Sequence, residues 1–211
     1  MKLYSYFRST AAYRARIALN LKGLPYETVP VHLVRDGGEQ RKPEFRAINP
    51  QMRLPTLVLS EGETLIQSLA IIMYLDEVYP DPPLLPADAT ERAHVRAAAL
   101  IVACDIHPLN NSGPLAYLRK TLGRDEAAVN AWINHWITEG FEALEKLIKP
   151  SPYAFGTQVT LADLCIVPQV ASARRFNVPL EAFPKIVAVD AACAKLPAFE
   201  KARPDRQIDA E

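Results

Sequence analysis

The segment Ser9–Ala12 carries two neighbouring hydroxyl side chains where an apolar run gives way to a helical pattern. The first amide groups of a helix lack partners inside it and carry a partial positive charge, so they favour an anion. A thiol, whose pKa is about 8.5 when free, ionises more readily beside such a helix start, above all when a hydroxyl donates to its sulfur. Ser9 and Thr10 can supply that hydroxyl. Either residue also suits a simple cap of the helix, so both interpretations stay open here.

Two further pairs of residues suit the binding of an extended polar ligand. Leu54 and Pro55 precede an expected strand, where a cis peptide would present the backbone N–H and C=O of Leu54 to a strand-like partner. An ordinary trans proline at a strand entry is the alternative. Gln67 and Ser68 stand at the start of an expected helix, where a hydroxyl and free amides can hold a carboxylate or simply cap the helix.

The cysteines and histidines show no pattern typical of a metal site or a disulfide framework. Cys104, Cys165 and Cys193 are odd in number, far apart and set among apolar neighbours. We therefore expect ordinary buried thiols in a reducing compartment, and no metal. No paired ligand spacing occurs among the histidines, which are His32, His94, His107 and His135.

The first part of the chain alternates strand-like and helix-like patterns. Residues Tyr13, Ile17 and Leu21 recur every four positions between Ala11 and Lys22, and Gly23 supplies a helix stop. The other expected elements are strands at 2–7, 26–32, 54–59 and 64–66, a loop with a short irregular helix at 34–49, and a helix at 69–79. The order β-α-β-α-β-β-α predicts a thioredoxin-like domain at residues 1–80.

A proline-rich stretch then separates this domain from a helical one. Four of the 18 prolines fall in the seven residues Pro80–Pro86, which predicts a linker. Beyond it we expect helices at 90–104, 126–149, 161–176 and 183–196, the third opened by a capping box at Thr160–Asp163. The predicted fold class is therefore α/β plus all-α, with a helical bundle domain at residues 88–211.

The overall composition narrows the classes of function. Of 211 residues, 49% are hydrophobic and 23% charged, and Lys+Arg equals Asp+Glu at 24 each. This balance argues against nucleic acid as a partner. No apolar run approaches the ~18 residues that a membrane span needs, and the first residues lack a signal-peptide layout. We expect no membrane association and a cytoplasmic location.

Five motifs together resemble the zeta class of glutathione transferases. They extend over essentially the whole chain and are Tyr4–Ser9, Arg14–Leu19, Leu54–Leu57, Ile66–Ile71 and Thr160–Asp163. The resemblance implies the glutathione transferase fold, in which the first domain binds glutathione as the cofactor. It also implies that the helical domain forms the substrate wall and that the protein is a homodimer.

The resemblance also implies roles for individual residues. Ser9 matches the serine that assists the glutathione thiolate, and Thr10 stands where a second serine is usual, with Arg8 beside the thiol. Arg8 and Arg175 match arginines that hold the carboxylates of the substrate. The positions that match contacts to glutathione are Gln40, Leu54, Pro55, Gln67, Ser68, His107, Asn111 and Ser112.

One departure from the family pattern bears on the chemistry. The usual motif reads Ser-Ser-Cys-Ser, whereas this chain has Ser9–Ala12, so the cysteine is missing. An isomerase that uses bound glutathione as its only nucleophile tolerates this change. Dehalogenase activities that need an enzyme cysteine do not.

The implied function is a glutathione-dependent cis–trans isomerase that converts maleylacetoacetate, a small dicarboxylate, to fumarylacetoacetate. The segment Asp36–Gln40 resembles that enzyme, whereas His107–Asn111 and Ser172–Phe176 resemble maleylpyruvate isomerases. A general glutathione transferase and a non-catalytic glutathione-binding protein on the same fold also stay open.

Overall fold

Strand β1 (Lys2–Ser5) is an inner strand of a four-stranded sheet with the order β2-β1-β3-β4 in the computed structural model, which describes residues 1–211. The parallel neighbour of β1 is β2 (Glu27–Pro30), and its antiparallel neighbour is β3 (Thr56–Val58). Strand β4 (Thr64–Ile66) completes a hairpin with β3. A parallel pair joined to an antiparallel hairpin is the predicted thioredoxin-like order.

Alternate residues of the first strand point to helices on opposite faces of the sheet. Tyr4 packs edge-on against Phe45 of α2 (Pro43–Ile48), with 5.8 Å between ring centroids. The next residue, Ser5, accepts a hydrogen bond of 3.0 Å from Arg16 of α1 (Thr10–Leu21). Helix α3 (Ser68–Val78) packs beside α1. Short 3-10 turns at Arg35–Gly37 and Glu39–Arg41 lead into α2.

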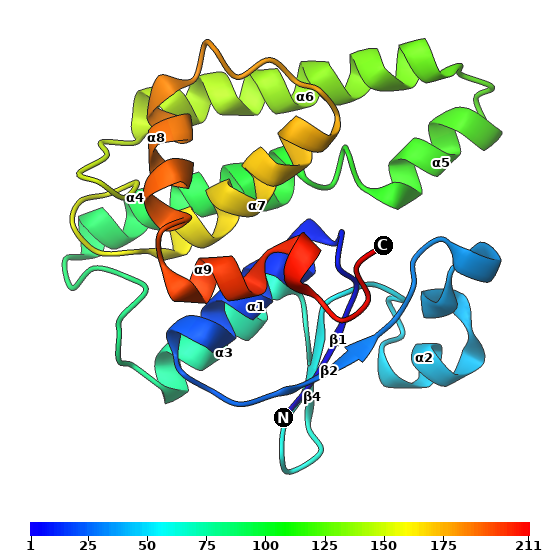
Figure 1. Cartoon of the computed structure of the whole chain (residues 1–211), viewed down its shortest axis with the longest axis horizontal. Helices are drawn as coiled ribbons and strands as arrows, with labels where there is room; N and C mark the ends of the chain where they lie inside the picture. Colours follow the sequence, from blue (N-terminus) through cyan, green and yellow to red (C-terminus); the bar gives the residue numbers. More distant parts are fainter. The chain divides into compact units, whose positions relative to one another are not determined.

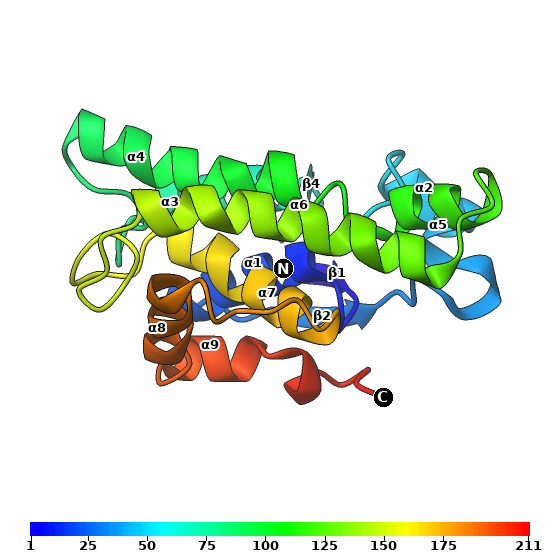
Figure 2. The ribbon, with the colours of Figure 1, turned by 90° about the horizontal axis from the view of Figure 1, so that it is seen from above.

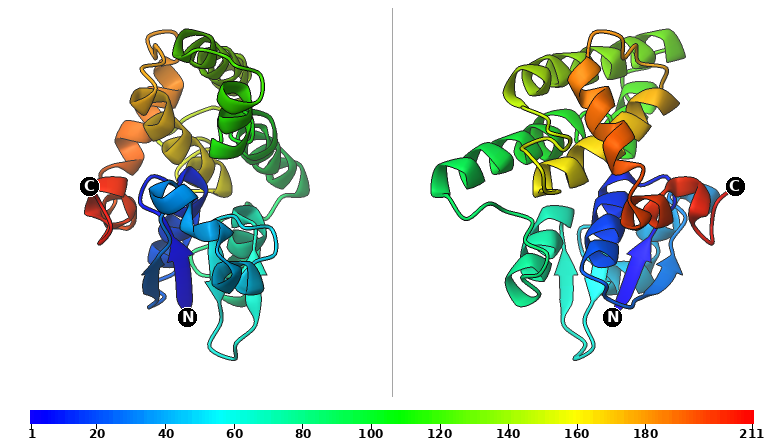
Figure 3. Two further views of the ribbon diagram at one scale, coloured as in Figure 1. Left: turned by 90° about the vertical axis from the view of Figure 1, so that its right-hand side faces the viewer. Right: turned by 60° about the vertical axis from the view of Figure 1, so that its left-hand side comes forward.

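The chain forms two units, and the end of the chain belongs to the first. The first unit comprises Met1–Pro83 and Lys195–Glu211, and the second comprises Leu84–Ala194 (Figure 1). The second unit therefore ends at Ala194, whereas the predicted helical domain extended to residue 211. The reason is that α9 (Pro197–Ala202) packs along α1, as the right-hand view of Figure 3 shows, and a 3-10 turn at Pro204–Arg206 follows it.

The second unit is helical, with α6 as its longest helix (Figure 2). Its helices are α4 (Ala89–Leu100), α5 (Ser112–Lys120), α6 (Glu126–Leu147), α7 (Leu161–Arg175) and α8 (Pro184–Cys193). A π-helical segment, Ile101–Ile106, continues α4. A glycine on α6 allows that segment to approach closely, because a Cβ at Gly140 would lie 2.2 Å from Cγ1 of Ile106.

The capping box predicted for Thr160–Asp163 is present at the start of α7. Asp163 is fully buried and accepts hydrogen bonds from the Thr160 N–H at 2.7 Å and from the Thr160 hydroxyl at 2.9 Å. It also accepts from the Ala154 N–H at 2.8 Å. The same carboxylate thus starts the helix and anchors the loop before it.

None of the helices combines the length and the hydropathy that a membrane crossing requires.

The prediction of three buried cysteines is wrong for one of them. Cys165 and Cys193 are buried, but Cys104 is exposed. Cys104 lies on the π-helical segment, whose buried side is formed by Val102 and Ile106. Apolar sequence neighbours therefore do not bury a side chain that points away from the core.

Buried Cys193 makes the stability of the fold sensitive to alkaline pH. Burial raises the pKa of this thiol above its ordinary value. The native chain therefore keeps a proton that the unfolded chain releases, so the stabilisation is complete at low pH and is lost as pH rises. We expect the free energy of unfolding to fall by about 2 kcal/mol between about pH 8 and 10 from this group.

Urea unfolding of Cys193→Ala and Cys104→Ala across this pH range tests the expectation. Cys193→Ala should flatten the fall, whereas Cys104→Ala should keep it because Cys104 is exposed. Identical pH profiles for the two variants would contradict this assignment.

Candidate functional site

The register of the sheet brings three of the predicted segments to one end. Tyr4 pairs with Thr56, and Thr56 pairs with Ile66, with β3 antiparallel to both of its neighbours. The turn after β1, the entry to β3 and the exit from β4 must therefore lie at the same end of the sheet. These segments carry Ser9, Leu54–Pro55 and Gln67–Ser68, which are far apart in the sequence.

Ser9 is the N-cap of α1 and keeps its hydroxyl proton for another partner. Its Oγ accepts a hydrogen bond of 3.2 Å from the Ala12 N–H. A hydroxyl that accepts one bond can still donate its own proton. Thr10 begins the helix and is only 8% exposed, whereas Ser9 is half-buried. The cap and the thiol-activating roles are therefore compatible in Ser9, whose hydroxyl is the more accessible of the two.

The helix start beside Ser9 is well suited to an anion. No acidic residue occurs in the first turn of α1, so nothing there neutralises its partial positive charge. Arg8 precedes the cap, is exposed, and places its guanidinium 4.8 Å from the centroid of the Phe7 ring. Arg8 and the start of α1 thus flank Ser9 in the sequence, and both carry positive charge.

The peptide bond between Leu54 and Pro55 is cis, which is one of the two alternatives that the sequence left open. Strand β3 begins only at Thr56, so Leu54 lies outside the regular ladder of the sheet. The loop before it is fixed by Asn49, whose side-chain amide donates to the Arg53 carbonyl at 2.8 Å and to the Thr56 hydroxyl at 2.9 Å. The Asn49 Oδ1 accepts from the Gln51 N–H at 2.9 Å.

Replacing Asn49 by alanine should destabilise the first unit by about 2–3 kcal/mol, because it leaves several groups of this loop without partners. Denaturant unfolding measures the effect. Asn134→Ala is the matched control, since that amide donates only to the Asn130 carbonyl at an exposed position. Equal stability of the two variants would contradict the role of Asn49.

Helix α3 begins without a side-chain cap. Gln67 occupies the N-cap position with φ +69° and ψ 118°, a conformation that costs a non-glycine residue about 1–3 kcal/mol. Its amide donates to the Gln51 Oε1 at 2.8 Å, and its side chain accepts no hydrogen bond from the helix. Ser68 is the first helical residue, and its Oγ accepts from Arg14 at 3.4 Å. An uncapped helix start next to a buried arginine suits a carboxylate.

Gln40 presents a buried acceptor that has no hydrogen-bond partner. It is 7% exposed, its Nε2 donates to the Leu33 carbonyl at 3.3 Å, and its Oε1 is unsatisfied. Gly38 makes room for this side chain, because a Cβ there would lie 2.6 Å from the Gln40 amide atoms. A buried acceptor in this state suits an N–H donor of a ligand.

The remaining predicted residues belong to the helical unit. His107 follows the π-helical segment, and its Nε2 lies 3.5 Å from the Asn111 Nδ2. Asn111 caps α5 by accepting from the Ser112 N–H at 2.7 Å. Arg175 is exposed at the end of α7, where its guanidinium lies 4.5 Å from the centroid of the Phe176 ring. The structure thus places His107, Asn111 and Ser112 together and Arg175 on another helix.

Sequence reasoning missed the residues that hold the loops of the first unit. Asn49, Arg14 and Arg16 are at most 1% exposed. Two arginines inside an otherwise apolar helical segment are a usable signal, because Arg is almost never fully buried without partners. The sequence offered no comparable signal for Asn49, whose partners lie in an irregular loop and at the start of β3.

A thioredoxin-like unit with an anion-favouring helix start, joined to an all-helical unit, is the architecture of the glutathione transferases. The family model for the N-terminal domain of glutathione S-transferases matches residues 3–83, and that for the C-terminal domain matches residues 126–199.

Individual relatives match the chain along its full length. A maleylacetoacetate isomerase of Pseudomonas aeruginosa is 52% identical, with 99% of this chain and 98% of that protein covered. The solved holo structure of a maleylpyruvate isomerase, described as a bacterial zeta-class glutathione S-transferase, is 54% identical with a TM-score of 0.96, and all of both chains is covered. A maleylacetoacetate isomerase of Anaeromyxobacter dehalogenans, solved with dicarboxyethyl glutathione and citrate in its active site, is 39% identical with a TM-score of 0.87, covering 100% and 97%. The chain belongs to the zeta class of the glutathione transferase family.

Proposed function

We propose that this protein is a glutathione-dependent cis–trans isomerase of maleyl-substituted keto acids, and that maleylacetoacetate is its substrate and fumarylacetoacetate its product. The observation that carries the proposal is the convergence of Ser9, Leu54–Pro55 and Gln67–Ser68 at one end of the sheet. The full-length similarity to isomerases of this kind supports it.

The residues of the first unit fit the parts of glutathione. The uncapped start of α3, with Gln67 and Ser68, suits the glutamyl carboxylate. The backbone of Leu54 suits the central peptide as a strand-like partner. The unsatisfied Oε1 of Gln40 suits an N–H of the tripeptide. His107, Asn111 and Ser112 are further proposed contacts from the helical unit.

Ser9 and α1 give the site its chemistry. When bound, glutathione supplies a thiolate whose reversible addition to the conjugated cis double bond leaves a single bond free to rotate. The Ser9 hydroxyl donates toward the sulfur, and the amides at the start of α1 favour its anionic form. Both effects lower the thiol pKa without a protein cysteine, which agrees with alanine at positions 11 and 12.

Arg8 and Arg175 are the proposed anchors for the substrate carboxylates. A guanidinium pairs with a carboxylate through two parallel hydrogen bonds, which fixes orientation as well as charge. Arg174, the neighbour of Arg175, is bound to Asp190 at 2.6 Å and is therefore engaged elsewhere. Arg175 is the proposed anchor because the family resemblance matches it to an arginine that holds a substrate carboxylate.

Maleylpyruvate is the second candidate substrate, because a maleylpyruvate isomerase is 54% identical to this chain. Turnover of both compounds with glutathione, measured side by side, separates the two. A strong preference for maleylpyruvate would overturn the first choice, and conjugation of electrophiles without isomerisation would indicate a general transferase. Tight glutathione binding without any turnover would indicate a non-catalytic binding protein.

A cytoplasmic homodimer is part of the same proposal, because the family resemblance implies it. Analytical ultracentrifugation of the whole chain tests the assembly. A mass near that of one chain over the working concentration range would overturn it.

A further inference from the structure

The last residues of the chain contact the turn that carries Ser9. The closing segment, defined here as Gln207–Glu211, follows α9 in the first unit. Within it, the Asp209 Oδ2 accepts a hydrogen bond of 3.0 Å from the Phe7 N–H. Phe7 is buried and stands two residues before Ser9. A carboxylate from the far end of the chain thus holds the exit of the first strand.

The peptide group between Tyr6 and Phe7 is bound at both of its ends by opposite charges. Its N–H donates to Asp209, while its carbonyl, that of Tyr6, accepts from the Arg16 guanidinium at 3.4 Å. The same carbonyl accepts from the Ser9 N–H at 2.9 Å. Hydrogen bonds in such a chain polarise one another, so Asp209 strengthens the bond that fixes the Ser9 backbone.

Arg16 is an integral part of the hydrogen-bonded arrangement around the peptide between Tyr6 and Phe7. It is fully buried and donates to the Phe7 carbonyl at 3.2 Å, to the Ser5 hydroxyl at 3.0 Å and to the Ala202 carbonyl at 3.0 Å. Burial lowers its pKa to about 10, and the negative charge of Asp209 is one of the influences that oppose this lowering. Arg16 therefore ties the end of α9 to the exit of the first strand.

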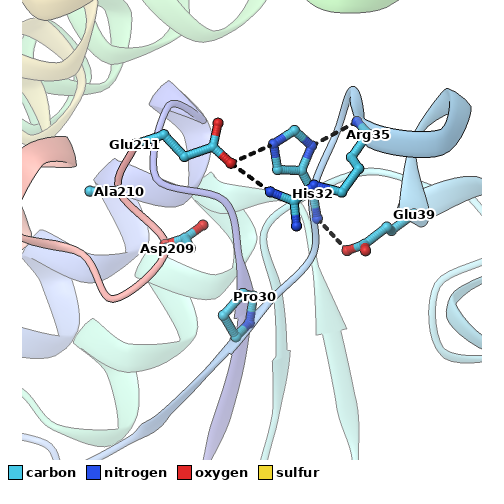
Figure 4. A pocket seen from close by; sticks show the side chains of 7 residues that line it. All are labelled: Pro30, His32, Arg35, Glu39, Asp209, Ala210 and Glu211. Carbon is cyan, nitrogen blue, oxygen red and sulfur yellow. Dashed lines mark hydrogen bonds and ion pairs between the residues drawn. The ribbon is translucent and has the colours of Figure 1, made fainter.

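A second anchor holds the closing segment in place. The Glu211 carboxylate lies 2.7 Å from the Arg35 Nη2 and 3.4 Å from the His32 Nε2 (Figure 4). The His32 Nδ1 accepts from the Arg35 N–H at 2.8 Å, so the ring is fixed by the loop that it contacts. These residues, with Asp209, line a cavity of about 430 Å³. Asp209 is thus positioned by the contact of Ala202, which precedes it in the sequence, and by the contacts of Glu211, which follows it.

We propose that Asp209 is a positioning residue for the glutathione site, which fixes the Ser9 turn through the peptide between Tyr6 and Phe7. This inference rests on the proposed function. Asp209 acts on the orientation of the Ser9 hydroxyl and of Arg8, and does not itself contact substrate or glutathione.

The test compares Asp209→Ala and Asp209→Asn with Asp205→Ala in the full-length chain. Asp205 lies in the same region but pairs with exposed Arg203, so its removal spares the Ser9 turn. Amide hydrogen exchange at Phe7 and Ser9 is measured without glutathione, and glutathione affinity is measured by calorimetry. We expect Asp209→Ala to speed both exchange rates and to weaken glutathione binding about tenfold. Asp209→Asn keeps an acceptor oxygen and should fall between Asp209→Ala and the unaltered chain.

Two negative outcomes are distinguishable. If Asp209→Ala matches Asp205→Ala in both exchange and affinity, the positioning role is wrong while the proposed function stands. If the unaltered chain does not bind glutathione, the proposed function is wrong, whatever the exchange rates show. Should Asp209→Ala fail to fold, Asp209→Asn decides the outcome, and exchange and affinity equal to those of the unaltered chain would overturn the role of its charge.

Discussion

Replacing Ser9 by alanine should lower kcat/KM for isomerisation about a hundredfold, because it removes the only hydroxyl that is both at the start of α1 and accessible. The loss should appear with saturating glutathione, since the variant binds the tripeptide through its other contacts but ionises its thiol less. Steady-state kinetics with the preferred substrate, at saturating glutathione over a range of pH, measures the effect.

Three variants separate activation of the thiol from capping of the helix. Ser9→Ala also removes the bond from the Ala12 N–H, at a cost of about 1 kcal/mol in stability. Ser9→Thr keeps both the cap and the hydroxyl, so it should retain most activity. Thr10→Ala should have a smaller effect than Ser9→Ala, because Thr10 is buried in the first turn. Unchanged turnover in Ser9→Ala would contradict the proposed role.

Replacing Asp163 by alanine should reduce the free energy of unfolding by about 3–5 kcal/mol, the largest effect on stability that we expect. The variant leaves the Ala154 and Thr160 N–H groups and the Thr160 hydroxyl without their acceptor. The start of α7 and the loop before it lose their common anchor. Denaturant unfolding followed by circular dichroism measures the loss.

Asp88→Ala is the matched control for this prediction. Asp88 also accepts from two backbone N–H groups, those of Thr90 and Glu91, but at an exposed position where water replaces it. Its loss should therefore destabilise the protein less. Equal losses for Asp163→Ala and Asp88→Ala would show that burial does not set the cost.

Burial raises the pKa of Asp163, so the stability that this carboxyl group contributes is complete at low pH and decreases as pH rises.

Much of the fold followed from short-range patterns. The four-residue recurrence of Tyr13, Ile17 and Leu21 predicted α1, which the structure places at Thr10–Leu21. The box at Thr160–Asp163 set the start of α7 at the residue expected. These signals depend on neighbours within one or two turns, so a single sequence carries them.

Features that depend on distant contacts were missed. Helix α9 is six residues long, begins at Pro197 and packs along α1, far away in the sequence. Helix α5 contains Gly113 and Pro114 near its start and buries only Leu115, so its apolar pattern is weak. Neither helix has a periodic signal of its own. For the same reason the predicted helical domain, 88–211, included α9 and the residues after it, which belong to the first unit.

The candidate site shows the same difference between local patterns and distant contacts. The sequence indicated which segments matter, and the pairing of Tyr4 with Thr56 and of Thr56 with Ile66 explains why they meet. The groups that hold those segments could not be found in this way. Asp209 reaches Phe7 across 202 residues of chain.

The ionisation state of bound glutathione tests the central claim most directly. The ultraviolet absorbance of the thiolate, titrated against pH with the protein in excess over glutathione, reports the pKa of the bound thiol. The arrangement of Ser9 and α1 predicts a pKa well below the value of about 8.5 for a free thiol. A bound thiol that titrates like free glutathione, or no binding at all, would contradict it.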